Sequence, residues 1–461
     1  MKTCTKVVTV FLVVSLILPT IAFAQTDIKV VLDGRKIDFD VEPLIENNRT
    51  IVPFRQVAEA IGARVDWDGA TRSVYAYKNA TRVVLQIDNK TAQINGREIE
   101  LDMPAVIRRN RTMVPLRFFA EAFGADVVWH GDSRTVVIST GPKPMEVMGY
   151  YYSKSYSDFM DNHKYLTSTA LKWYTFDENG GIVTKDTNRW ILVPEGYKEV
   201  LNTAKMSGVK TYAMVFESSS KRLNSLLNDK SKRNQLIKEL VNLTLEEGFD
   251  GINIDFEFLK ENDRDVFNTF VKDLAESLHK KQKTLSLSVP VKTEKADWFK
   301  GYDYETLGRY ADVIVLMAYD KNPAAAVPQA PIEWVEEVVD YAVARIPSYK
   351  ILLGIGFYGY DWANGRKKTV LHTRRDFDYG VQFIDEIIEK YGSKPVWDEK
   401  SQMMYMEYTD ENGLKHVMWY ESEESTWEKI KLAKRKGLGG IAIWRLGYTT
   451  SGFWNVIKDN I

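Results

Sequence analysis

The stretch Asp250–Glu257, which reads Asp-Gly-Ile-Asn-Ile-Asp-Phe-Glu, constrains the fold of this 461-residue chain more than any other. Its apolar and polar residues alternate, which is the periodicity of a β-strand. Asn253, Asp255 and Glu257 therefore project from one face of the strand. Polar side chains on the inward face of a buried strand are costly unless they are paired or used. We therefore expect this strand to be buried and its acids to take part in chemistry.

Short apolar strands alternate with amphipathic helices from Met145 to the end of the chain, which is typical of a parallel sheet. Eight candidate strands are Glu146–Tyr151, Ala170–Phe176, Thr211–Phe216, Gly251–Phe256, Thr284–Val289, Val313–Met317, Ile351–Gly356 and Gly440–Trp444. The fold class predicted for residues 146–461 is α/β, as one (β/α)8 TIM barrel.

The segment of residues 363–424, between the last two candidate strands, is too long for an ordinary loop. Gln402–Tyr408 and Lys415–Tyr420 alternate across a turn sequence and predict a hairpin, and Asp378–Tyr391 is predicted to be helical. We therefore expect a small α+β insertion between strands 7 and 8. It either forms one wall of a cleft or only packs on the barrel.

Five motifs near the ends of these strands follow one another in a fixed order. Asp250–Glu257 is close to D-G-x-D-x-D-x-E, Met317–Asp320 reads M-x-Y-D, and Gly354–Gly359 approaches G-x-P-x-Y-G with phenylalanine in place of proline. Gly149–Tyr151 lies on the first strand and Gly439–Trp444 on the last. Taken in chain order, the five motifs resemble those of family 18 glycoside hydrolases, the chitinase-like (β/α)8 barrels. The resemblance places the active site at the C-terminal ends of the strands.

The resemblance implies a retaining cleavage of a glycosidic bond, in which the N-acetyl oxygen of the substrate attacks C1. Glu257 would be the general acid, with a pKa raised by burial and by the charge of Asp255. Asp255 would hold the acetamido N–H, and the Tyr319 hydroxyl would bind the acetamido oxygen. The residues expected to bind the substrate are Trp444, as an apolar floor under the sugar, with Asp320, Tyr150, Asn253, Met317 and Tyr358. No cofactor is implied.

Two departures from the family pattern indicate one branch of it. Asn253 replaces the middle aspartate, and Val215–Ser219 stands where the family has S-x-G-G. In both features the chain resembles the branch that includes spore-cortex-associated N-acetylglucosaminidases. This resemblance implies cleavage of β-1,4 bonds after N-acetylglucosamine in peptidoglycan-type glycans. The alternatives are a chitinase or endo-N-acetylglucosaminidase on chitin or glycoprotein glycans, and a lectin-like barrel that only binds. Because an amide cannot share charge with Asp255, we expect a shifted pH profile.

Residues 25–140 contain an internal duplication with a period of 62. Asn48–Arg55 recurs as Asn110–Arg117, and each copy reads as strands around one helix, so we expect a duplicated small α+β domain. The pair resembles the copper amine oxidase N-terminal-like, or stalk, repeats of bacterial exported proteins. That resemblance implies a spacer or a cell-wall-binding module, and neither copy has a histidine cluster for copper. Four residues are predicted either as core and brace residues or as glycan contacts: Trp67, Trp129, Arg55 and Arg117.

Residues 1–24 are predicted to be a signal peptide, with two lysines before an apolar run and an Ala-x-Ala cleavage site at Ala24. The only cysteine, Cys4, lies in this leader. Residues 141–145 are expected to be a linker. We expect a bacterial protein that is secreted or held in the cell envelope, with no membrane span after the leader. The formal charge of −1 gives no basic excess that would indicate nucleic-acid binding. The five histidines lack metal-ligand spacing, so no metal site is predicted.

Overall fold

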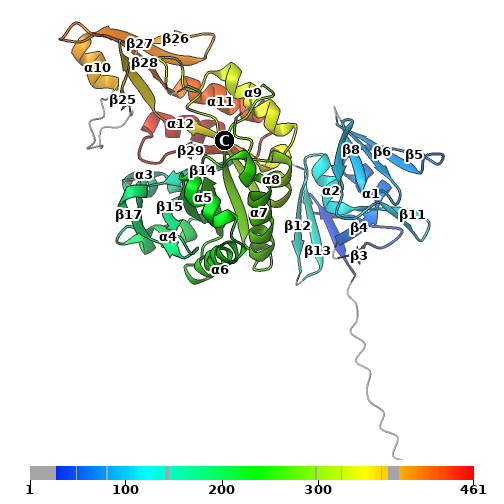
Figure 1. The fold of residues 1–461 in the computed structure, drawn as a ribbon. Coiled ribbons are helices and arrows are strands. Elements are labelled where there is room, and N and C mark those ends of the chain that lie inside the picture. The colour runs from blue at the N-terminus through cyan, green and yellow to red at the C-terminus, as the bar shows by residue number, and fades with distance from the viewer. Residues whose placement is uncertain are drawn as a thin grey trace, which may run out of the picture. The chain divides into compact units, whose positions relative to one another are not determined.

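The computed structural model describes residues 27–47, 49–78, 81–131, 133–140, 145–152, 154–295, 298–322, 324–364, 366–371 and 384–461. The predicted signal peptide, residues 141–144 of the predicted linker and residues 378–383 of one predicted helix lie outside this part of the chain. The chain divides into two compact units, Met1–Lys143 and Pro144–Ile461, shown in Figure 1. Among the helices of the described residues, none is long and apolar enough to cross a membrane.

Eight parallel strands of the second unit close into a barrel (Figure 1). In sheet order they are β14 (Glu146–Tyr151), β29 (Gly440–Trp444), β23 (Ile351–Gly356), β22 (Val313–Met317), β21 (Thr284–Pro290), β20 (Gly251–Phe256), β19 (Lys210–Glu217) and β15 (Ser168–Phe176). The barrel closes because β14 pairs with both β29 and β15. All eight predicted strands are confirmed, with ends that differ by two residues or fewer.

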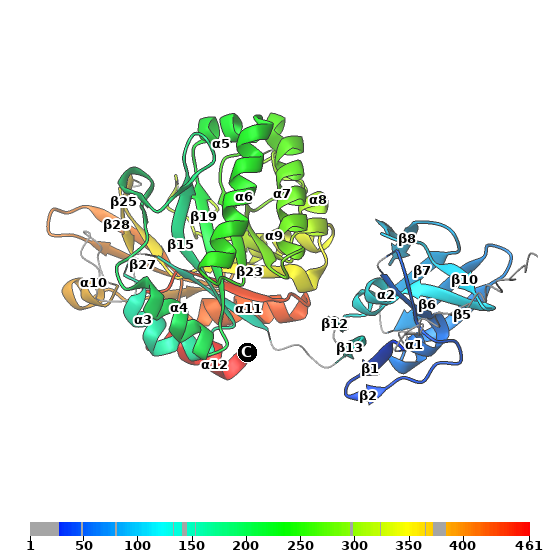
Figure 2. The ribbon, with the colours of Figure 1, turned by 90° about the horizontal axis from the view of Figure 1, so that it is seen from below.

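Helices cover the outside of the barrel, and Figure 2 shows α5 to α8 alongside β15 and β19. The helices of this layer are α3 (Tyr156–Asn162), α4 (Tyr197–Met206), α5 (Ser220–Leu227), α6 (Lys230–Glu246), α7 (Arg264–His279), α8 (Tyr304–Tyr310), α9 (Ile332–Val343), α11 (Glu423–Arg435) and α12 (Ser451–Asn460). The apolar face of α7 lies against the barrel as its sequence period predicts. Because helices cover one face of the sheet and side chains fill the other, β20 is buried at every position.

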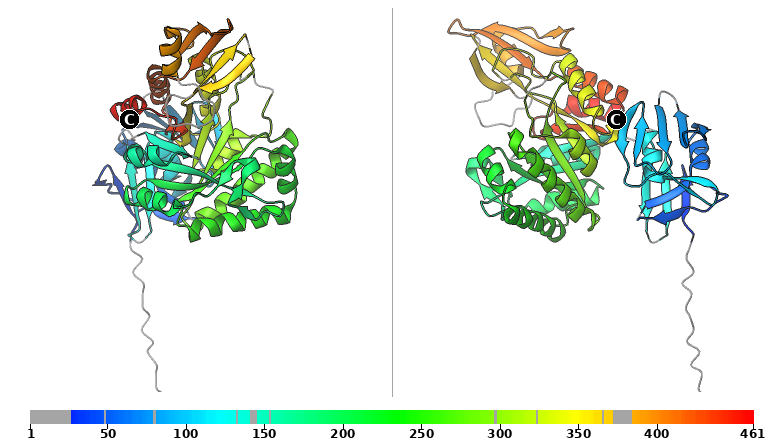
Figure 3. Two further views of the ribbon diagram at one scale, coloured as in Figure 1. Left: turned by 90° about the vertical axis from the view of Figure 1, so that its left-hand side faces the viewer. Right: turned by 45° about the vertical axis from the view of Figure 1, so that its right-hand side comes forward.

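The predicted insertion is a five-stranded sheet with one helix, drawn in yellow and orange in Figure 3. Its elements are β24 (Gly359–Ala363), β25 (Arg366–Leu371), α10 (Ile384–Tyr391), β26 (Val396–Asp398), β27 (Met403–Thr409) and β28 (Lys415–Tyr420). The antiparallel pairing of β27 with β28 confirms the predicted hairpin. The sheet starts before residue 363, because the chain that leaves β23 turns almost at once into β24.

The first unit is built from two copies that exchange strands. One sheet holds β1 (Lys29–Leu32), β2 (Arg35–Lys36), β12 (Asp126–His130) and β13 (Thr135–Ser139). A second holds β5 (Arg64–Asp68), β6 (Ser73–Lys78), β7 (Thr81–Gln86), β8 (Thr91–Ile94) and β9 (Arg97–Glu100). The third holds β3 (Leu44–Glu46), β4 (Arg49–Pro53), β10 (Val106–Arg108) and β11 (Arg111–Pro115), and α1 (Phe54–Ala60) and α2 (Leu116–Ala122) follow β4 and β11.

The two copies meet back to back at equivalent positions. β4 and β11 pair antiparallel with Val52 opposite Val114, and these two residues are separated by the repeat period of 62. The local two-fold axis of the duplication therefore passes through this pair. The rings of Phe54 and Phe119 lie 4.9 Å apart and bring the two helices onto one shared core. Neither copy buries its apolar residues without the other.

A buried ion pair lies where the insertion returns to the barrel. The Glu421 carboxylate accepts hydrogen bonds from the Lys429 amine at 3.0 and 2.9 Å, and both side chains are almost fully buried. Glu421 also accepts from the Ser425 hydroxyl, and its backbone N–H donates to the Tyr358 carbonyl. Glu421 thus connects the end of β28 with the first turns of α11 through its side chain and with the start of β24 through its backbone.

The Lys429→Met variant tests this connection, because it leaves the Glu421 carboxylate buried without its cation. We expect the free energy of unfolding in urea to fall by about 3–5 kcal/mol. The double variant Glu421→Gln/Lys429→Met removes both charges and should regain most of that loss. A single variant that unfolds at the wild-type urea concentration would contradict a stabilising role for the pair.

Candidate active site

A cavity of about 190 Å³ opens where barrel strands end, and it gathers most of the residues predicted as the site. Its lining consists of Tyr150, Lys172, Phe216, Asp255, Glu257, Ser288, Met317, Tyr319, Asp320, Tyr358 and Trp444. Of the nine predicted site residues only Asn253 is missing from this lining, because it lies deeper in the barrel and is fully buried. A larger cavity, of about 540 Å³, lies in the first unit, but of ionisable groups it holds only two arginines and one aspartate.

Asn253 belongs to a hydrogen-bond chain beneath the cavity. Its amide Nδ2 donates to the Ser286 hydroxyl at 2.9 Å, and the Ser288 hydroxyl donates to its Oδ1 at 3.2 Å. The Tyr150 and Ser288 hydroxyls lie 2.6 Å apart. With the Ser288 proton directed to Asn253, the Tyr150 hydroxyl donates to Ser288. Asn253 and Tyr150 are therefore held in place from below.

Asp255 places an unpaired oxygen in the cavity. Its side chain is 3% exposed, and Oδ1 is buried without a hydrogen-bond partner among the described residues. Burial, followed by the charge of Glu257, raises the pKa of Asp255 well above its ordinary value. A buried acceptor that lacks a donor costs free energy, about 1–3 kcal/mol for a neutral group and more for a charged one. This oxygen is therefore placed to receive an N–H or O–H from a bound molecule.

Glu257 follows the last residue of β20 and is half-buried at the cavity wall. Its backbone N–H donates to the Glu217 carbonyl at 2.9 Å, which fixes the direction of the chain. Burial raises the pKa of Glu257, the Lys172 charge lowers it, and the Asp320 charge raises it further. A carboxyl group with a raised pKa retains its proton to a higher pH and can act as an acid there.

Two residues beside the cavity have left-handed backbone angles. Phe258, next to Glu257, has a φ of 58°, and Asp320 has a φ of 57°. Such angles are uncommon outside glycine and persist where the surrounding structure holds them. Asp320 is held by the Tyr360 hydroxyl, which donates to its Oδ1 at 2.5 Å. The inserted strand β24 therefore fixes a carboxylate of the cavity.

Aromatic side chains form the remaining walls. Trp444 is half-buried, and its ring contacts that of Tyr150 edge to face at 5.5 Å. Tyr319 and Tyr358 meet in the same way at 6.2 Å, and burial raises the pKa of both hydroxyls well above the ordinary value. Both tyrosines therefore stay protonated and can donate. A further cluster consists of Tyr358, Tyr360 and Trp362, with Trp444 packed against it.

Lys172 lines the cavity and was not found by the sequence analysis. It projects from β15, with Nζ 3.6 Å from the centre of the Phe216 ring and 5.3 Å from that of Trp444. Burial lowers the pKa of Lys172, whereas the charges of Asp255 and Glu257 raise it. Its amine makes no hydrogen bond within the described part of the chain. The available signal was that Lys172 is the single charged residue of the strand Ser168–Phe176.

The segment that replaces S-x-G-G carries a second feature that the sequence did not disclose. Glu217 is 1% exposed and pairs with Arg189 at 3.0 Å and Arg222 at 2.8 Å. Its other oxygen accepts from the backbone N–H groups of Ser218 and Ser219. This carboxylate is fully paired, so it braces the end of β19 and offers nothing to a ligand. Ser286 and Ser288 were also missed, although they alternate with leucine and valine on β21.

Comparison with known proteins agrees with this geometry. Residues 146–448 match the family model "Glycosyl hydrolases family 18", and residues 31–138 match "Copper amine oxidase N-terminal domain". The glycosylase YvbX of Bacillus subtilis strain 168, called uncharacterized, is 28% identical over 66% of this chain and 87% of its own. A cortical fragment-lytic enzyme of the same organism is 30% identical over 51% of this chain and 55% of its own.

Solved structures show the same barrel. The crystal structure of a chitinase from Chromobacterium violaceum ATCC 12472 has a TM-score of 0.62 and 27% identity, covering 69% of this chain and all but 1% of the other. The family model spans the whole barrel, from the first strand to beyond the last. The second unit carries the acids, the aromatic walls and the strand order of that family, and the chain belongs to glycosyl hydrolase family 18 as a glycoside hydrolase.

Proposed function

We propose that this chain cleaves β-1,4 bonds after N-acetylglucosamine in peptidoglycan-type glycans. The unpaired Oδ1 of Asp255, buried beside a Glu257 of raised pKa, carries the proposal. An N-acetyl group offers the N–H that this oxygen lacks, and the protonated Glu257 can give its proton to the glycosidic oxygen. The same two residues can thus act on two atoms of one sugar.

The proposed reaction proceeds in two steps. Glu257 protonates the leaving oxygen while the acetamido oxygen attacks C1, which breaks the C1–O bond, gives an oxazolinium ion and releases the following sugar with a free hydroxyl. Asp255 accepts the acetamido N–H, and the Tyr319 hydroxyl donates to the acetamido oxygen. Glu257, now a carboxylate, takes a proton from water, which opens the ring at C1 with net retention. Trp444 lies under the apolar face of the sugar.

The choice of peptidoglycan over chitin rests on two observations. Asn253 stands where the family signature has aspartate, and it is engaged with Ser286 and Ser288. One relative, 30% identical, is named a cortical fragment-lytic enzyme. The similarity to a chitinase structure favours chitin as the second candidate, and the products distinguish the two. We further propose that residues 1–24 direct the chain out of a bacterial cell and that the mature protein acts at the cell envelope.

Incubation with purified peptidoglycan tests the reaction. We expect fragments with new reducing N-acetylglucosamine ends by mass spectrometry, and a loss of at least about 100-fold in the rate for Glu257→Gln, because an amide cannot give a proton. Glu261→Gln, a change at an exposed glutamate beyond the cavity, should keep the wild-type rate. Cleavage of N-acetylglucosamine oligomers without cleavage of peptidoglycan would favour the chitinase. An undiminished rate for Glu257→Gln would exclude it as the acid.

The pH dependence of kcat/KM tests the part of Lys172. The acid form of Glu257 is active, so activity is present below its pKa and is lost as the pH rises through it. The Lys172 charge lowers that pKa, so Lys172→Met should move the alkaline limb to higher pH. Lys172→Arg keeps the charge and should leave the limb near its wild-type position. A limb that does not move in Lys172→Met would show that this amine carries no charge in the working enzyme.

A further inference from the structure

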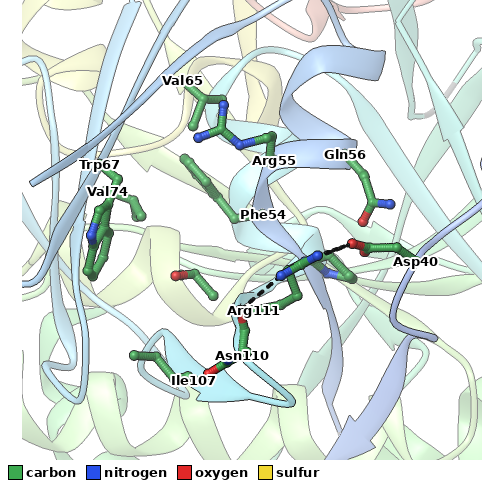
Figure 4. A pocket seen from close by; sticks show the side chains of 12 residues that line it. Asp40, Phe54, Arg55, Gln56, Val65, Trp67, Val74, Ile107, Asn110 and Arg111 are labelled. Carbon is green, nitrogen blue, oxygen red and sulfur yellow. Dashed lines mark hydrogen bonds and ion pairs between the residues drawn. The ribbon is translucent and has the colours of Figure 1, made fainter. Parts of the chain in front are cut away.

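The first unit contains a cavity of about 540 Å³ beside the helix α1 and the hairpin of β5 and β6 (Figure 4). This volume lies within the range of sites for small ligands, about 300–1,000 Å³. The cavity is lined by Asp40, Pro53, Phe54, Arg55, Gln56, Val65, Trp67, Val74, Ile107, Asn110, Arg111 and Thr112. Both repeat copies contribute to it, and every lining residue lies within this one unit.

An indole forms one side of the cavity. Trp67 is 44% exposed, and Figure 4 shows its ring beside Val74, across from Phe54. An exposed indole next to a hollow suits a flat ligand with apolar C–H groups on one face and polar groups at its edge. A pyranose sugar has this character.

The polar side of the cavity has one net positive charge. Its charged residues are Arg55, Arg111 and Asp40, so the lining carries two guanidinium groups and one carboxylate. Arg111 is occupied, because Nε donates to Asp40 at 2.7 Å and Nη1 donates to the Asn110 carbonyl at 3.2 Å. The Gln56 side chain hydrogen-bonds the same Asp40. Arg55 has only a loose ion pair with Glu59 at 3.6 Å, and its side chain is 61% exposed.

Comparison of the two repeat copies shows which cavity residues recur in both copies and which occur in the first copy alone. The pair Arg111–Asp40 recurs as Arg49–Asp102, at 2.7 Å, so this pair braces both copies. Position 56 is different, because its equivalent in the second copy is Phe118, which packs against the core.

Trp67 differs from its equivalent in the same way. Trp129 is half-buried and packs against the core, whereas Trp67 is exposed at the cavity. The second copy therefore packs Phe118 and Trp129 against the core, whereas the first copy has Gln56 and an exposed Trp67 at the equivalent positions. Core packing explains Trp129, and it leaves the exposed Trp67 without a structural reason.

We propose that this cavity binds one carboxylate-bearing sugar of an amino-sugar glycan chain. The sugar ring stacks on Trp67, its carboxylate pairs with Arg55, and its hydroxyl or amide groups meet Gln56 and Asn110. The choice of an amino-sugar chain rests on the proposed function, since in peptidoglycan every second sugar carries a lactyl ether whose acid group can be free. The first unit then holds the polymer that the barrel cleaves.

Calorimetric titration of the full chain tests the site, in the Glu257→Gln background so that the polymer is not cut. The probe is soluble peptide-free glycan strands of peptidoglycan, with their lactyl carboxylates free. We expect two binding components, one from the barrel and one from the cavity of the first unit. Trp67→Ala and Arg55→Gln should each weaken the component of the first unit about tenfold or more. Gln56→Phe, which introduces the residue of the second copy, should remove the same component by filling the cavity.

Arg117→Gln is the matched control. Arg117 occupies the equivalent position in the second copy, is 63% exposed and has the same loose pairing, with Glu121 at 4.0 Å. It should leave both components unchanged. Equal losses in Arg55→Gln and Arg117→Gln, or no loss in Trp67→Ala, would overturn the site.

The ligand class is tested with chitin oligomers, which have the same linkage without the carboxylate. Weak binding of the chitin oligomers at the first unit, unchanged by Arg55→Gln, supports the proposal. Binding as tight as that of the peptidoglycan strands overturns the carboxylate assignment. Hydrolysis of soluble fragments by the Trp67→Ala chain with Glu257 intact reports on the barrel alone, so failure of this site and failure of the proposed reaction are told apart.

Discussion

The arrangement of side chains at the C-terminal ends of the barrel strands depends on two acids held in one buried space. Asp255 and Glu257 lie two residues apart on the inward face of one strand. Burial makes ionisation of both costly, and the charge of Glu257 for Asp255, and of Asp320 for Glu257, adds to that cost. Lys172 offsets part of that charge from the next strand but one. An aspartate at position 253 would add a third negative charge below them. The amide found there avoids this charge and donates to Ser286 at the same time.

The insertion is tied to the same acids through β24. This strand begins three residues after the seventh barrel strand ends, so its aromatic face cannot shift without moving the barrel rim. Tyr360 from β24 holds Asp320, and the buried pair of Glu421 and Lys429 fixes the return of the chain. The insertion, this carboxylate and the barrel are therefore connected by these contacts.

Most of the barrel could be predicted, because each strand carries its own periodicity and five of the eight carry a motif. The predicted residues came together at the cavity since strand ends of a closed barrel meet at one rim. Lys172, Ser288 and the pairing of Glu217 could not be found in this way. Their significance depends on which strands become neighbours and on side-chain directions, which the pattern of a single strand does not give. In the first unit the period of 62 disclosed two copies, but similarity between copies says nothing about which strands pair.

The exchange of strands in the first unit has a consequence for the order of folding. β1 pairs in parallel with β13, the last strand of the unit, with Lys29 opposite Thr135. A chain that emerges from its N-terminus therefore exposes an unpaired strand edge until more than a hundred further residues have followed. The sheet of β1, β2, β12 and β13 therefore cannot close early in synthesis, whereas the sheet of β5 to β9 draws on one continuous stretch of the chain. The former sheet becomes complete only when the segment leading into the barrel has itself appeared.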